Sequence, residues 1–158
     1  MARTLMIGAA VAVPMLSSTA FAQQPSQFGT ADEARAMFLR AVAAVKADKS
    51  KALDMFNKGE NGFLDRDLYV FCNNVRDAKA VANGNPQLKQ FLGTDTRDRK
   101  DSTGKAYGLE LYAAGQKPEG QITEVSYLAA RPSNPTPVPK VSIVTRIGDI
   151  YCGVGYYK

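Results

Sequence analysis

The apolar residues of this sequence change their period near Asp67, and this change constrains the fold more than any other feature. Before it, apolar side chains recur at the helical spacing i, i+3, i+4 and i+7, as at Phe38, Ala41, Val42 and Val45. After it, aromatic and β-branched residues alternate with polar ones, a pattern typical of strands. A chain that places its helices first and its strands afterwards is expected to form an α+β fold with an antiparallel sheet.

The helical part is predicted to form two helices, or one bent helix, over residues 31–58. Thr30 and Glu33 have the spacing of a capping box, which marks the start of a helix. The apolar stripe is lost over 47–51 and resumes at Ala52, and Gly59 is a typical helix terminator.

The strand part is predicted to form a hairpin and then a three-stranded meander, with strands at 67–72, 78–84, 120–130, 140–148 and 149–158. Residues 85–112 lack a strand pattern and predict an irregular crossing with short helices at 86–91 and 107–114. A long crossing of this kind inside a compact domain usually carries function. Four prolines within 131–139 predict an extended, stiff loop.

The first 22 residues have the layout of an export signal. A short apolar run follows Arg3, and Ala20-Phe21-Ala22 provides a small-x-small cleavage pattern. The run is shorter than the about 20 apolar residues that span a bilayer, and an uncleaved membrane anchor is the alternative. We therefore expect a periplasmic or secreted chain without a membrane span, in which a polar segment at 23–30 precedes one domain at 31–158.

The composition excludes several classes of function. Histidine is absent, which removes the commonest general base and the commonest zinc ligand. The sequence has neither a G-x-S-x-G turn nor a phosphate-binding glycine loop, so no cofactor, metal or enzymatic activity is predicted, and an enzyme built on Asp67 or Tyr69 is the last alternative. The formal net charge is +5, but signs alternate along 94–101, which is typical of a solvated surface and not of a nucleic-acid site.

Cys72 and Cys152 are the two cysteines of the chain. In an oxidising compartment they are expected to form one disulfide, which would place two of the predicted strands side by side. Redox chemistry is the alternative, although the spacing is not that of a C-x-x-C motif.

The predicted strand at 140–148 separates an apolar face from a polar one. Lys140, Ser142 and Arg146 share the polar face, and Tyr127 lies on the preceding strand with the same alternation. Two interpretations stay open at this point. If the crossing covers this face, the residues form a small cavity whose cations favour an anion such as a carboxylate. Otherwise they are solubilising side chains on an open sheet face.

Six segments together resemble the single Cache domains, which are extracytoplasmic sensor modules with a PAS-like sheet. Between about residue 34 and residue 158 they are, in order, GFLDRDLYVF, NGNPQL, DSTGKAYG, GQITEVSY, PVPKVSIVTRIGD and GVGYYK. The resemblance implies a five-stranded antiparallel sheet with an N-terminal helical stretch on one face. It also implies a ligand held between the other face and the crossing, typically a small metabolite and often an organic acid.

The resemblance further suggests which positions bind the ligand. They are Tyr69, Tyr127, Arg131, Lys140, Ser142 and Arg146. The last two depend on which face of the sheet is concave. Cys72 lies on the opposite strand face from Tyr69, which would keep the disulfide clear of the site. The sequence departs from the family where NNVRDA replaces a tight Asp-Gly turn, and where Ala129 and Ala130 stand in place of bulky aromatic residues. The smaller side chains would widen the mouth of the pocket, so the resemblance does not fix the size of the ligand.

We therefore expect a free-standing sensing module for a small molecule, because Lys158 ends the chain where receptors of this family continue into a membrane span. Such a module would signal through a partner protein. The alternative is a ligand-independent protein-interaction module that docks on a membrane receptor or kinase.

Overall fold

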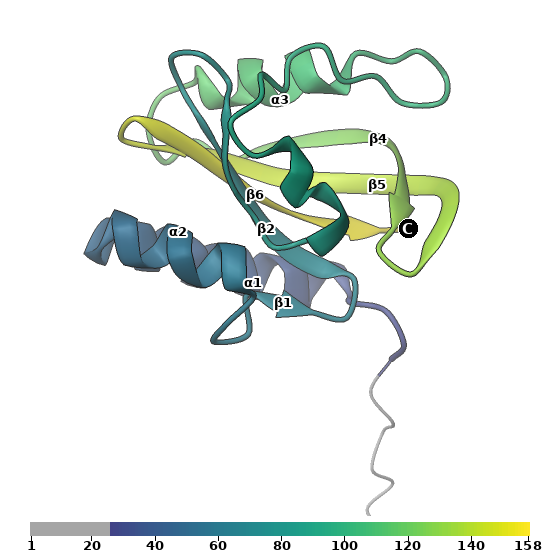
Figure 1. Ribbon diagram of the computed structural model, residues 1–158, viewed down its shortest axis with the longest axis horizontal. Helices are drawn as coiled ribbons and strands as arrows, with labels where there is room; N and C mark the ends of the chain where they lie inside the picture. Colours follow the sequence, from purple (N-terminus) through teal and green to yellow (C-terminus); the bar gives the residue numbers. More distant parts are fainter. Residues whose placement is uncertain (1–25) are drawn as a thin grey trace, which may run out of the picture.

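The computed structural model describes residues 26–158, so the predicted export signal at 1–22 lies outside the described residues (Figure 1). In chain order the elements are α1 (Ala31–Ala47), α2 (Lys49–Lys58), β1 (Leu64–Asp65), β2 (Leu68–Asn74), β3 (Ala80–Asn83), the 3-10 helix η1 (Pro86–Phe91), α3 (Tyr107–Gly115), β4 (Thr123–Arg131), β5 (Asn134–Ile147) and β6 (Ile150–Tyr157). Among these residues, no helix has both the length and the apolar character needed to cross a membrane.

The helices α1 and α2 form the first layer, and the predicted pair of helices is confirmed. Thr30 and Glu33 form the expected capping box: Thr30 Oγ1 accepts from Glu33 N at 3.2 Å, and Glu33 Oε2 accepts from Thr30 N at 2.8 Å. Asp48 separates the helices, because its backbone is extended and its carboxylate accepts from Lys51 N at 3.0 Å, which caps α2. Gly59 ends α2 with a left-handed φ of 70°.

The second layer is an antiparallel sheet whose long strands lie in the order β3-β2-β6-β5-β4. This order confirms the predicted PAS-like α+β fold, in which a hairpin and a meander join through the last strand. The two-residue strand β1 pairs with the start of β2 and was not predicted. Because β6 lies between β2 and β5, it contributes to the centre of the sheet.

Cys72 and Cys152 form the predicted disulfide. They are direct partners in the ladder between β2 and β6, with Cα atoms 4.1 Å apart. Both pack with Phe38 and Phe56, which project from α1 and α2 into the main core. The disulfide therefore lies on the helix side of the sheet.

The prolines of 131–139 do not form the predicted loop, and this expectation is wrong. β4 continues to Arg131 and β5 begins at Asn134, so three of the prolines lie inside β5. Pro135, Pro137 and Pro139 alternate along the strand, and alternate residues direct their backbone nitrogens to the same edge. That edge faces away from β4, because Pro139 O accepts from Lys158 N at 2.8 Å. The missing N–H groups therefore cost no hydrogen bond with β4.

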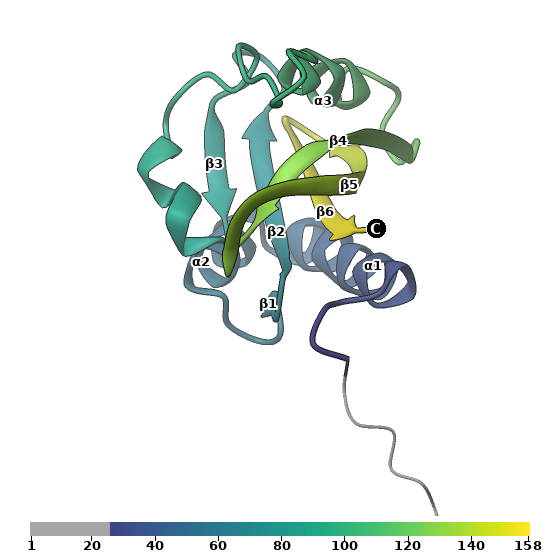
Figure 2. The ribbon, with the colours of Figure 1, turned by 90° about the vertical axis from the view of Figure 1, so that its right-hand side faces the viewer.

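The irregular crossing and α3 form the third layer, on the face of the sheet opposite α1 and α2 (Figure 2). The short helices predicted within the crossing appear as η1 and α3. A smaller core of Leu111 and Ala114 from α3 with Phe71, Val144 and Tyr151 from the sheet holds this layer in place. The chain thus has one apolar core on each side of the sheet.

Candidate functional site

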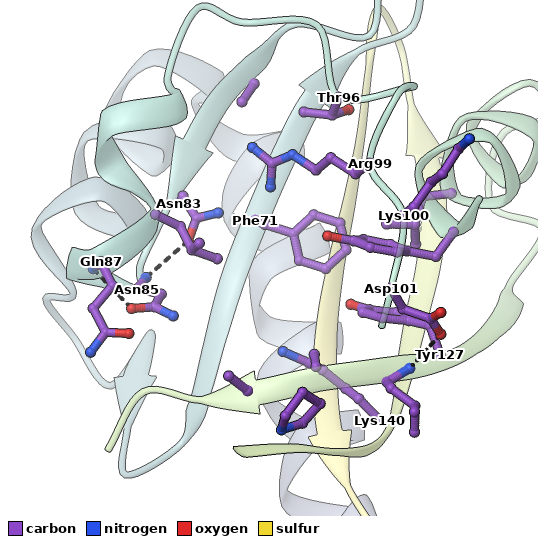
Figure 3. A pocket seen from close by; sticks show the side chains of 18 of the residues that line it. Phe71, Asn83, Asn85, Gln87, Thr96, Arg99, Lys100, Asp101, Tyr127 and Lys140 are labelled. Atoms are coloured by element: carbon purple, nitrogen blue, oxygen red, sulfur yellow. Dashed lines mark hydrogen bonds between the residues drawn. The ribbon is translucent and has the colours of Figure 1, made fainter. Parts of the chain in front are cut away.

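A cavity of about 320 Å³ lies between the sheet and the crossing (Figure 3). β2, β4 and β5 contribute its floor, β3 and η1 one side, and residues 96–102 with α3 its roof. Phe71 and Leu111 give it an apolar body, while most other lining side chains are polar or aromatic. The crossing therefore covers the polar face of the sheet and encloses a site of the size used for small molecules.

Lys140 provides a buried cation at the floor, with 2% of the residue exposed. Its Nζ donates to the Tyr69 hydroxyl at 2.9 Å and to the Tyr157 hydroxyl at 3.3 Å. The same nitrogen lies 4.3 Å and 4.5 Å from the centres of these two rings. Within residues 26–158, no carboxylate forms an ion pair with Lys140. An ammonium has three N–H donors, and the tyrosines use two of them.

The tyrosines of the floor respond to burial and to this charge in opposite ways. Burial opposes the ionisation of Tyr69, but the charge and hydrogen bond of Lys140 outweigh it and hold the pKa of Tyr69 below its ordinary value of 10.0. Burial raises the pKa of Tyr127 and of Tyr157. The Tyr127 hydroxyl forms a 2.9 Å hydrogen bond with Ser142 Oγ, so both groups are fixed beneath the cavity.

The roof contributes an aromatic ring and a second cation. Tyr107 stacks on Tyr127, with ring centres 4.2 Å apart and planes 3° from parallel. Burial raises the pKa of Tyr107, and the nearby Arg99 opposes this shift. The Arg99 guanidinium lies 4.7 Å from the centre of the Phe91 ring. Its Nη2 is buried and has no hydrogen-bond partner in the part of the chain that the structure describes.

Asp101 fixes the roof to the sheet. Its Oδ1 accepts from Thr103 Oγ1 at 2.6 Å, from Thr103 N at 2.9 Å and from Lys105 N at 3.1 Å. Its Oδ2 accepts from Leu128 N of the edge strand β4 at 3.0 Å. The Thr103 hydroxyl and these backbone amides lower the pKa of Asp101 to about 2. Both oxygens are therefore engaged by the chain itself.

Amide side chains form the side wall next to β3. Asn83 Oδ1 accepts from Asn85 N at 3.0 Å, and Asn85 Oδ1 accepts from Gln87 N at 3.0 Å, which caps η1. Asn57 of α2 holds Asn83 in turn, because its side-chain oxygen accepts from Asn83 N at 2.9 Å. The wall is therefore polar and fixed by backbone hydrogen bonds.

Four of the six predicted ligand-binding residues lie at or directly beneath the cavity. Tyr69, Tyr127 and Lys140 line it. Ser142 is fully buried below Tyr127 and does not reach the lining. The face of β5 that carries Lys140 is thus the one that the crossing covers.

Arg131 and Arg146 lie outside the lining. Arg131 Nε lies 3.2 Å from Asp67 Oδ2, and its guanidinium stacks 4.1 Å from the Phe28 ring centre. Arg146, near the other end of β5, donates to Gly148 O at 2.9 Å. Alternation predicts the face of a strand on which a residue lies, but not whether the cavity extends that far along the strand.

The sequence reasoning missed Asn83, Asn85, Arg99 and Asp101, which all line the cavity. Residues 94–101 were interpreted as a solvated surface. That interpretation holds for Arg97, which pairs with Asp95, but not for Arg99. The available signal was the predicted crossing itself, since long irregular segments often carry function.

The described residues offer no evident metal site: within 26–158, no three His, Cys, Asp or Glu side chains come close enough together to hold an ion. The chemistry that the cavity offers is therefore that of three cations (Arg99, Lys100 and Lys140), several hydroxyls and amides, and aromatic walls.

Comparison with solved structures identifies the fold. A methyl-accepting chemotaxis protein from Vibrio parahaemolyticus is 20% identical, with a TM-score of 0.63 over 80% of this chain and 86% of that one. The periplasmic sensor domain of a chemotaxis protein is 22% identical, with a TM-score of 0.58 over 80% and 88%. A Cache chemosensory domain described for carboxylic acid recognition is 22% identical, with a TM-score of 0.57 over 80% and 86%. No family model and no curated protein matches the sequence. The chain therefore has the fold of a single Cache-type sensor domain.

Proposed function

We propose that this protein is an extracytoplasmic sensing module that binds a small carboxylate in the cavity and passes the signal to a partner protein such as a membrane receptor or kinase. The proposal rests on the environment of the Lys140 ammonium group. Its ammonium is buried, and only tyrosine hydroxyls and rings replace its hydration. Burying a cation without a counter-ion is costly, and a carboxylate ligand supplies that counter-ion.

The charge of the whole lining supports an anionic ligand. Arg99, Lys100 and Lys140 line the cavity, and the lining carboxylate, Asp101, is engaged by the chain. The carboxylic acid recognised by one protein of the same fold agrees with this charge. The predicted export signal supports a location outside the cytoplasm, where a sensing module has access to external metabolites.

The test is calorimetric titration of the purified protein, with its disulfide formed, with short carboxylic acids and with amines of the same chain length. Acids are expected to bind and amines are not. Saturating acid at about 100 times Kd should stabilise the protein by about 2.7 kcal/mol in thermal unfolding.

Two matched variants separate the role of Lys140 from a general charge effect. Lys140→Met removes the buried ammonium and should abolish binding of acids. Lys46→Met removes an exposed ammonium from α1, on the other face of the sheet, and should bind acids as the wild type does. Binding of acids that survives Lys140→Met, or an absence of binding to folded wild type, would refute the proposal. The second result would favour the ligand-independent interaction module.

A further inference from the structure

We propose that the ligand carries two anionic groups, one bound by Lys140 at the floor and the other by Arg99 at the roof, so that short dicarboxylates are preferred over monocarboxylates. This inference rests on the proposed function and specifies its ligand class. It concerns the second cation, which the proposed function does not require.

Arg99 is held as a cation without a counter-ion. Among residues 26–158, its Nη2 is the single buried side-chain nitrogen without a hydrogen-bond partner. The guanidinium lies over the Phe91 ring. Arg97, two residues earlier, forms an ion pair with Asp95, and Arg131 forms one with Asp67. A guanidinium binds a carboxylate through two parallel hydrogen bonds, which is the interaction that Arg99 lacks.

Within the described residues, 26–158, no carboxylate at the cavity pairs with Arg99. Asp101 is the acidic residue of the lining, and its two oxygens accept hydrogen bonds from Thr103, Lys105 and Leu128. A ligand group is then the remaining source of negative charge for Arg99. An unpaired buried charge is destabilising, so a ligand that neutralises it gains affinity.

The two cations belong to opposite walls. Arg99 reaches into the cavity from the roof and Lys140 from the floor, with the Phe71 and Tyr127 rings between them in Figure 3. A single carboxylate group bound by Lys140 would leave Arg99 unpaired. The volume of about 320 Å³ is near the lower end of the range for ligand sites, which fits a short molecule with an anion at each end and an apolar centre.

The test compares acids of equal carbon number by calorimetric titration: propionate with malonate, butyrate with succinate, and pentanoate with glutarate. For the pair that best matches the cavity, the dicarboxylate is expected to bind wild type at least about tenfold more tightly. Arg99→Gln should weaken dicarboxylate binding by at least about tenfold and monocarboxylate binding by less, so that the difference between the two acids disappears. Arg97→Gln, which changes an arginine outside the lining, should preserve the difference.

Retained monocarboxylate binding also shows that Arg99→Gln is folded, and its thermal unfolding provides a second check. Equal affinity for the two acids of every pair in wild type would overturn this inference and leave the proposed function intact. A dicarboxylate preference that persists in Arg99→Gln would overturn it as well. Failure of both series to bind would overturn the proposed function itself.

Discussion

Gly155→Ala is expected to disable the cavity without changing any residue of its lining. Gly155 lies on β6, directly opposite Ser142 in the ladder between β5 and β6, and the side chain of Lys140 passes over it. A Cβ atom at this position would lie 2.2 Å from Lys140 Cε and 2.9 Å from Ser142 Oγ. The glycine is therefore needed for the Lys140 ammonium to reach the cavity between its two tyrosines.

The magnitude follows from these distances. Lys140 Cε must retreat by about 1.3 Å to reach the usual carbon contact of about 3.5 Å. A shift of this size stretches the hydrogen bonds of 2.9 Å and 3.3 Å to the tyrosines beyond hydrogen-bond range. Overpacking of a core position costs about 1–3 kcal/mol. A domain of ordinary stability, about 5–15 kcal/mol, tolerates this loss, so the variant should fold with a displaced ammonium.

A double-mutant cycle with Lys140→Ala isolates the effect. The Lys140→Ala background removes the nearest contact of the new methyl group, that with Lys140 Cε, so Gly155→Ala should cost at least about 1 kcal/mol less there than in wild type. Urea unfolding of the four proteins measures this coupling, and calorimetric titration should show Gly155→Ala binding carboxylates at least tenfold more weakly than wild type, about 1.4 kcal/mol. Additive costs, or unchanged affinity in Gly155→Ala, would show that Lys140 does not lie over Gly155.

Three further perturbations test other parts of the structure. Replacing Cys72 and Cys152 by alanine should lower the free energy of unfolding by up to about 4.5 kcal/mol in urea, because the disulfide closes a loop of 80 residues, yet carboxylate binding to the folded variant should persist. The pKa of Asp101, about 2, lies below its ordinary value of 3.8. The hydrogen bond that its carboxylate accepts from the Leu128 amide should therefore be fully formed above pH 3.8 and lost as the pH falls through 2. The protection of the Leu128 amide against hydrogen exchange should fall over that pH range, and it should also fall in Asp101→Asn at neutral pH. Protection that neither change reduces would contradict this hydrogen bond. Thr30→Ala should cost about 1 kcal/mol in urea unfolding through the lost cap, with ligand affinity unchanged.

The fold was predictable where local chemistry decides the structure. The capping box of Thr30 and Glu33, the left-handed Gly59 and the alternation after Asp67 each act within a few residues, and each element appears where they indicate. Alternation alone does not say that β6 lies between β2 and β5. The expected disulfide between Cys72 and Cys152 indicated that β2 and β6 are neighbours, and the PAS-like sheet as a whole was what the resemblance to a known family implied.

The proline-rich segment was predicted wrongly for a reason that involves the neighbouring strands. Proline disfavours a central strand because it lacks an N–H donor. In β5 the affected residues precede Lys140, where pairing with β6 begins, so their nitrogens face an edge that β6 does not occupy. The sequence shows the three alternating prolines of β5, but it does not show that the neighbouring strand β6 is too short to pair with them.

The sequence indicated residues of the cavity floor but not those of the roof. Tyr127 and Lys140 were found because a strand has a fixed period, so a polar residue on an otherwise apolar strand is conspicuous. Arg131 was assigned to the site only through the resemblance to a known family, and its position depends on Asp67, which lies 64 residues away in the chain. No local pattern reveals such a pairing.

Arg99 was missed because it lies in a run of alternating charge, which usually indicates mutual neutralisation at a surface. The turn that follows changes this balance. Asp101 is followed by Thr103, and an aspartate at this spacing accepts hydrogen bonds from the backbone ahead of it. The turn thereby occupies one oxygen of the Asp101 carboxylate, and Leu128 N occupies the other. Arg99 lines the cavity beside this turn, and its Nη2 has no hydrogen-bond partner in the part of the chain that the structure describes, which the charge count does not reveal.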